Sequence, residues 1–392
     1  MTEEVSDDRS YESEGADNGD NESSSDGMEA DEVVVADIDE LEEVIPFTYT
    51  ITSFGADFLV DGLVNRLNAG DIVIPTYDPK VSVDSGISGF QRSSVWTRTQ
   101  MDRFIESLLL GLPVPEIFLV SEPSNILLVL DGQQRLRTLR DFIGGVTRGR
   151  EYRLRNVQKQ FSGKRFKDLD DEDRRRLLNS VIHATIVRQD TPSNDNSSIY
   201  MLFERLNTGG TLLQPQEMRV ALFRGPLMEL LRDLNETSAW RALYGPPSKR
   251  LKDQELILRF FALLHMGASY ERPMKEFLNT YAGQNRQLNL QNGDELRSEF
   301  IQTTTAILEN IGPNAFRLAS AQVNAALLDS FMVGIADRLR SGPITDKDAA
   351  RAAYEQLVAD DEYLAAVQRS TADEDRVTLR LARARAAFQT VP

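Results

Sequence analysis

The 392-residue chain has no cysteine and only two histidines, which excludes disulfides and thiolate sites and argues against a His-rich metal centre. Its net charge of −17 belongs to residues 1–45, which hold 18 acidic groups and one arginine, whereas the remainder carries 43 acidic and 43 basic groups. No apolar run reaches the roughly 18 residues of a membrane span. We therefore expect a cytoplasmic protein with no membrane contact.

The acidic N-terminal segment, residues 1–44, is rich in Ser, Asp, Glu, Gly and Asn. Such a composition buries too little apolar surface to fold, so we predict a disordered tail. A solvating role is favoured over mimicry of nucleic acid.

Short apolar runs and helical periodicity alternate from residue 45 onward. The pattern predicts a strand over Ile45–Ile51, a helix over Ala56–Leu67, a strand over Ile72–Pro75, a helix after Thr97 and a strand over Ile117–Val120. Thr97 with Gln100 three positions later forms a capping box, which marks the start of the second helix. Arg92 precedes that helix and could face an anion, although such a residue is more often an ordinary surface arginine.

The stretch from Ile126 to Gly145 reads as a buried strand, a tight turn at Asp131-Gly132, and a helix that opens at Gln133. A turn of this kind points free backbone N–H groups and the positive end of the helix dipole at one place, which suits an anion. Gly132 would let a ligand approach the backbone, and Arg135, Arg137 and Arg140 add positive charge. The alternative is an ordinary strand-to-helix turn with a solvated basic face.

Residues 135–167 hold eleven Lys/Arg against two acidic residues, Asp141 and Glu151. This segment could follow a DNA phosphate backbone. It could equally be a solvated loop balanced by the acidic run Asp168–Asp173, which we expect to begin another helix. A strand over Val181–Val187 follows, and its His183 is interpreted as structural and without a functional role.

The second half of the chain changes to helical periodicity. A helix from Ser197 should end at Asn207-Thr208-Gly209-Gly210, and a further helix is predicted over Pro215–Leu222. Beyond residue 225 only helical stripes follow. We predict an α+β fold with a domain over 45–225 and an all-α region over 226–392, the latter for partner docking, for dimerisation or simply as a core.

Three spaced motifs stand in order along this chain. They are Phe90-Gln91-Arg92…Trp96, Asp131-Gly132-Gln133-Gln134-Arg135, and Phe203 to Gly210 followed by Glu217-Met218-Arg219, with the two-proline loop Leu108–Pro115 between the first two. Together they resemble the N-terminal domain of GmrSD-type modification-dependent restriction enzymes, a domain related to the ParB/sulfiredoxin fold. The resemblance covers roughly residues 50–225.

This resemblance implies a domain that binds a nucleoside triphosphate (NTP), in a family associated with NTP hydrolysis, DNA cleavage or its control, and defence against phage. The residues carried across are Asp131, Gly132, Gln133, Gln134 and Arg135 at the phosphates, Gln91 and Arg92 as second contacts, and Asn207, Gly209 and Glu217 around the pocket. Phosphoryl transfer needs positioning and charge neutralisation. Arg135 could clamp phosphate, Asp131 or Glu217 could hold Mg²⁺ or orient water, and Gln134 could position water.

The sequence also departs from this family. Ser93 stands where the family often has a proline, and the nearly histidine-free C-terminal part cannot be the His-Asn-His nuclease of larger relatives. The absence of cysteine excludes sulfiredoxin chemistry. We expect a Mg²⁺-dependent NTPase that acts on DNA or is controlled by it. The rivals are a non-hydrolytic ParB-like DNA-binding switch and a nuclease that uses the same pocket; a protein partner is also conceivable.

Overall fold

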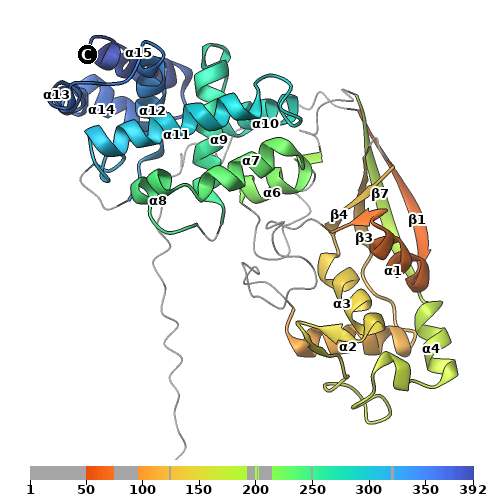
Figure 1. Cartoon of the computed structure of the whole chain (residues 1–392). Helices are drawn as coiled ribbons and strands as arrows, with labels where there is room; N and C mark the ends of the chain where they lie inside the picture. The colour runs from red at the N-terminus through yellow and green to blue at the C-terminus, as the bar shows by residue number, and fades with distance from the viewer. Residues whose placement is uncertain are drawn as a thin grey trace, which may run out of the picture.

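The computed structural model has two parts, a sheet domain and a helical region (Figure 1). It describes residues 50–74, 96–122, 125–191, 199–200, 202, 214–248, 250–318 and 322–392. The predicted acidic tail, the motif that contains Gln91 and Arg92, and the turn that contains Asn207 and Gly209 all lie outside the described residues.

The sheet domain is built on a mixed five-stranded sheet in the order β1-β7-β3-β4-β2. Its strands are β1 (Thr50–Leu59), β2 (Ile72–Val73), β3 (Ile117–Ser121), β4 (Leu127–Asp131) and β7 (Val181–Thr191). β7 pairs antiparallel with β1 and parallel with β3, while β4 pairs antiparallel with β3 and parallel with β2. A separate two-stranded ladder joins β5 (Val146–Thr147) and β6 (Arg150–Glu151).

Helices cover one face of this sheet. They are α1 (Val60–Ala69), α2 (Arg98–Leu109), α3 (Gln133–Gly144) and α4 (Asp171–Leu178), and the short 3-10 turn η2 (Phe166–Asp168) precedes α4. Alternate residues of β3 and β4, such as Ile117, Leu119 and Val129, form a core with apolar residues of these four helices. The period of two along the strands thus sends every second side chain to this face.

The other face of β3 and β4 belongs to a different core. Val120, Leu128 and Leu130 are buried together with residues of the helical region, and Phe118 packs against the same cluster. A strand that is buried on both faces reads as a continuous apolar run. This explains why Ile126 to Leu130 show no alternation in the sequence.

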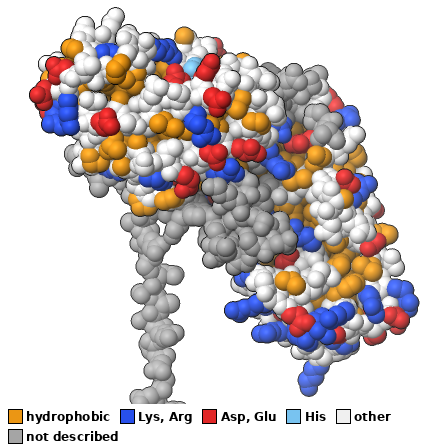
Figure 2. All heavy atoms as spheres, in the orientation of Figure 1, with side chains coloured by type: hydrophobic (Ala, Val, Ile, Leu, Met, Phe, Trp, Pro, Cys, Tyr) orange, Lys and Arg blue, Asp and Glu red, His pale blue; other side chains and the backbone are white. Residues whose placement is uncertain are grey.

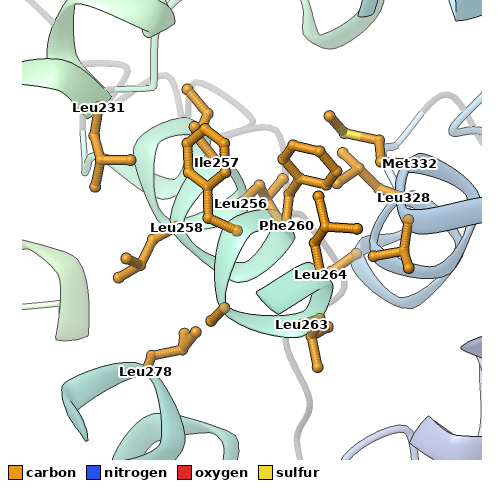
Figure 3. Close-up of a cluster of buried hydrophobic side chains, with 14 of the residues drawn as sticks. Leu231, Leu256, Ile257, Leu258, Phe260, Leu263, Leu264, Leu278, Leu328 and Met332 are labelled. Carbon is orange, nitrogen blue, oxygen red and sulfur yellow. The ribbon is translucent and has the colours of Figure 1, made fainter. Parts of the chain in front are cut away.

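The helical region is organised around α9 (Lys252–Met266). The other helices are α6 (Pro215–Leu222), α7 (Pro226–Asn235), α8 (Ser238–Tyr244), α10 (Met274–Gln284), α11 (Gly293–Asn310), α12 (Ala325–Leu339), α13 (Lys347–Val358), α14 (Asp361–Gln368) and α15 (Glu374–Gln389), with the 3-10 turn η4 (Gly267–Ser269) after α9. Figure 3 shows apolar side chains of α9 among Leu231 of α7, Leu278 of α10 and Leu328 of α12. A helix that is apolar on most sides is buried by its neighbours.

The predicted α+β class is confirmed, with the sheet in the N-terminal part and helices in the C-terminal part. The capping box at Thr97 is also confirmed: Gln100 N donates to Thr97 Oγ1 at 3.3 Å and Thr97 N donates to Gln100 Oε1 at 2.8 Å. The division at residue 225 stays a prediction. None of the described helices is long and apolar enough to cross a membrane.

One predicted element is wrong. Residues Ala56–Leu59 were expected in a helix, but they continue β1, and Leu59 pairs with Val181 at the end of the ladder. Phe58 and Leu59 fit a helical stripe and a strand equally well in the sequence. These residues form a strand because the eleven-residue partner β7 provides hydrogen bonds along this whole stretch.

Candidate functional site

The turn between β4 and α3 lies where the sequence predicts it, with α3 beginning at Gln133. Gly132 is its N-cap and has φ +91°, in the left-handed region that favours glycine. A Cβ at this position would lie 2.4 Å from Cγ2 of Ile117 on the neighbouring strand. The glycine is therefore required by backbone conformation and by packing against β3, whether or not a ligand also approaches it.

No side chain of a described residue caps the N-terminus of α3. Its N-cap makes no side-chain hydrogen bond, and no acidic residue lies in its first turn. The first N–H groups of a helix have no partner within the helix. Gln133 and Gln134 are half-buried beside them, and neither side-chain amide has a hydrogen bond to another described residue.

Arg135 ties this turn to the adjacent strand. Its NH2 donates to Asp131 Oδ2 at 2.7 Å and to the backbone carbonyl of Glu116 at 3.0 Å. The side chain of Arg135 is only 13 % exposed, whereas that of Asp131 is 52 % exposed. Asp131 thus presents a carboxylate to solvent, and Arg135 positions that carboxylate; the predicted phosphate clamp by Arg135 stays a prediction.

The described part of the third motif, Glu217-Met218-Arg219, is buried in the interior. Both carboxylate oxygens of Glu217 accept hydrogen bonds from Arg250, from Nε at 3.2 Å and from NH2 at 2.9 Å. The oxygen that faces NH2 also accepts the backbone N–H of Gln214 at 2.7 Å, which caps α6. Glu217 is 4 % exposed, so a metal ligated here would compete with Arg250. Its predicted role in metal binding stays untested.

Arg219 is also buried, at 1 % exposure, and donates four hydrogen bonds. Its Nε reaches Asn279 Oδ1 at 2.9 Å, and NH1 reaches Glu255 Oε2 at 2.8 Å and Gln216 Oε1 at 3.3 Å. NH2 reaches the carbonyl of Lys275 at 3.2 Å. This arginine therefore holds α6 against α9 and α10.

No group of three or more Asp, Glu or His side chains in the described part of the chain is arranged to hold a metal ion. Mg²⁺ is commonly held by one or two carboxylates together with phosphate oxygens and water. The exposed Asp131 beside the N-terminus of α3 fits that mode of binding. It does not form a metal site without a phosphate ligand.

His183 lies on the solvent-exposed side of the sheet and not in its core. It is 67 % exposed, and its Nδ1 lies 2.5 Å from Oδ1 of Asp57 across the β1–β7 pair. On the same ladder, Thr185 Oγ1 donates to the Glu116 carboxylate at 3.0 Å. The sequence indicated neither contact, because partners on neighbouring strands are far apart along the chain.

The basic segment 135–167 is partly neutralised. Glu151 accepts from Arg153 and Arg165, and Asp168 accepts from Arg165; these hydrogen bonds hold the pKa of both carboxyls below their usual range. On α3, by contrast, burial raises the pKa of Asp141 above its usual value, although Thr147 and Arg140 act against it. The exposed cations without an ion pair among the described residues are Arg148, Arg150, Arg155, Lys159 and Lys167.

These features define a sheet-and-helix domain in which the helix that follows β4 has no side-chain cap from a described residue. Glu217 and Arg219 hold α6 in place. Residues 72–224 match the family model described as the GmrSD restriction endonuclease, N-terminal domain. This stretch of the chain is thus similar to the N-terminal domain of that family, and the resemblance that the motifs predicted is confirmed over residues 72–224. Neither a curated protein nor a solved structure matches the chain.

Proposed function

We propose that this chain is a restriction-type defence protein that acts on DNA and binds a nucleoside triphosphate at the Asp131–Arg135 turn. The match of residues 72–224 to a family named for restriction endonucleases supports the first part. The second part is carried by one observation: the N-terminus of α3, beside an exposed carboxylate, has no side-chain cap from a described residue. Phosphates are favoured at such a helix end by the free N–H groups and the helix dipole.

Each residue of the turn would have a separate role in binding the nucleotide. The backbone N–H groups of Gln133 and Gln134 face the phosphates, and their side-chain amides can donate further hydrogen bonds. Arg135 keeps the Asp131 carboxylate in place through its contact at 2.7 Å. Asp131 would hold Mg²⁺ together with the phosphates, and a bound Mg²⁺ neutralises phosphate charge.

Hydrolysis would require an oriented water at the terminal phosphate. Gln134 is the residue at this turn with a side chain suited to that task, because its amide both donates and accepts. Its backbone carbonyl accepts from Thr138 Oγ1 at 2.7 Å within α3, so the backbone that carries the amide is ordered. We therefore propose Asp131 and Gln134 as the catalytic residues and Arg135 as a positioning residue.

The test is phosphate release from each of the four NTPs with Mg²⁺, with and without DNA. Wild type is compared with Asp131→Asn and Gln134→Ala. The matched control is Asp61→Asn, an exposed carboxylate on α1 of the same domain. Turnover that is lost in both turn variants and kept in the control supports the proposal. Turnover unchanged in the turn variants contradicts it.

A second candidate function is a DNA-binding switch in which the nucleotide is bound without being hydrolysed. The exposed cations of the segment 135–167 favour DNA as the macromolecular partner. Nucleotide binding to wild type without phosphate release under any condition would support this candidate over the NTPase. DNA breakage in the same reactions would support a nuclease at the same turn.

A further inference from the structure

We propose that residues 152–159, which we call the arch, are a preformed contact for the phosphate backbone of DNA, positioned by three residues of α2. The inference rests on the proposed function in taking DNA as the partner. It names the part of the basic segment that meets DNA and the buried carboxylate that shapes it.

Three residues of α2, spaced four apart, hold the backbone of the arch. Arg98 NH2 donates to the carbonyl of Arg153 at 2.5 Å, and Glu106 Oε1 accepts the N–H of Gln158 at 2.6 Å. Residues four apart lie on one face of a helix. Asp102, between them, therefore faces the middle of the arch.

Asp102 is the central anchor. Its Oδ2 accepts the backbone N–H of Arg155 at 3.1 Å, the backbone N–H of Asn156 at 3.2 Å and the side-chain amide of Asn156 at 3.0 Å. Its other oxygen lies 3.0 Å from Arg98 Nε, and the Asp102 side chain is fully buried. A buried carboxylate with this many donors fixes the backbone around it.

The N-terminal part of the arch is anchored in the core of the sheet domain. The ring of Tyr152 lies beneath the Arg98 guanidinium at 3.8 Å and packs edge-on against Phe142 of α3. Leu154 is buried, and its N–H donates to the carbonyl of Lys164 at 3.0 Å. The arch is thus attached to α2, to α3 and to the following loop.

The side chains on the outside of the arch carry uncompensated charge. Arg155 and Lys159 are exposed and make no ion pair with another described residue, whereas the neighbouring Arg165 is paired with Glu151 and Asp168. Lys and Arg side chains gather at the end of the sheet domain farthest from the helical region (Figure 2). Because the backbone of the arch is already ordered, DNA binding would cost little of the conformational entropy that is usually lost when a loop is ordered.

The first experiment measures binding of a labelled DNA duplex by fluorescence anisotropy at several salt concentrations. The double variant Arg155→Ala/Lys159→Ala should bind at least about tenfold more weakly at 0.1 M salt, and its salt slope should fall by about 2. The matched control, Arg351→Ala/Arg369→Ala, removes two exposed cations from the helical region. It should bind as wild type does.

The second experiment tests the positioning role of Asp102. Asp102→Asn removes one negative charge, so an electrostatic effect alone would strengthen DNA binding. A positioning role predicts the opposite, weaker binding although every cation is still present. Glu106→Gln should act in the same direction and is the variant to use if Asp102→Asn does not fold, as judged by thermal unfolding.

The outcomes test separately whether the protein binds DNA and whether the arch makes the contact. If wild type binds no DNA at any salt concentration, the DNA part of the proposed function is wrong, and the inference about the arch is wrong as well. If wild type binds but the arch variant equals the control, only the inference about the arch is wrong. Tighter binding by Asp102→Asn or Glu106→Gln would overturn the positioning role.

Discussion

Two motifs of this domain each contain an acidic residue and an arginine close to it in sequence, but the environments of these residues differ. At the Asp131–Arg135 turn the carboxylate is 52 % exposed, and no side chain of a described residue caps the helix. On α6, Glu217 and Arg219 are almost fully buried and every polar contact is made within the protein. Similar residue types therefore face solvent in one place and hold helices together in another, and burial distinguishes the two.

The largest expected effect is on the buried motif. Arg219→Ala removes four hydrogen bonds and leaves Glu255 and Asn279 without their partner, so we expect a loss of about 3–5 kcal/mol in the free energy of unfolding. Urea unfolding measures it, with the exposed Arg224→Ala as control. A loss below about 1 kcal/mol would show that α6 is not held by this arginine.

Gly132→Ala comes next. The positive φ and the collision with Ile117 Cγ2 should together cost about 2–4 kcal/mol of the free energy of unfolding. Ile117→Ala removes the atom that collides, so part of that cost should disappear in the double variant. A double-mutant cycle by urea unfolding measures the coupling. Additive effects would mean that conformation alone requires the glycine.

Asp131→Asn and Glu217→Gln compare the two carboxylates directly. Because Asp131 is exposed, its exchange should change the free energy of unfolding by at most about 1 kcal/mol. Glu217→Gln should cost about 1–3 kcal/mol, since it weakens the charge-assisted hydrogen bonds that the buried Glu217 carboxylate accepts from Arg250. Urea unfolding of both variants measures the contrast. Equal losses in the free energy of unfolding would show that the difference in burial between Asp131 and Glu217 has no effect on stability.

The smallest effect concerns Asp141, which lies on α3. Burial raises its folded pKa, so the ionised form costs stability above its unfolded pKa and costs none below it. Asp141→Asn should therefore stabilise the protein at neutral pH, and the gain should vanish as the pH falls below the ordinary value of 3.8. Thermal unfolding between pH 3 and pH 7 measures this. A gain that does not depend on pH would contradict the assignment.

Local signals allowed the element boundaries near the turn to be predicted. The apolar run before Asp131, the break at Gly132 and the spacing of Leu136, Leu139 and Phe142 are all contained within twenty residues, and α3 starts and α6 spans where the sequence placed them. The family was also predictable, because its motifs follow one another in order.

Contacts between distant segments could not be predicted in the same way. Arg250 lies 33 residues from Glu217 and Asn279 lies 60 residues from Arg219, and nothing in the local pattern joins them. From the sequence alone, Gly132 was explained by the approach of a ligand. The side chain that leaves no room for a Cβ there is Ile117, which belongs to another strand and is not apparent from the local pattern. The contacts of Asp102 could not be predicted for the same reason, since Arg155 and Asn156 lie 53 and 54 residues away.

The attachment of α6 bears on how this domain can be inherited and exchanged. The family match ends at residue 224, but Arg219 and Glu217 take their partners from residues 250–279. A fragment ending there would also lose the cover over Val120, Leu128 and Leu130. Recombination that joins this domain to a new C-terminal region must therefore supply equivalent partners for Glu217 and Arg219.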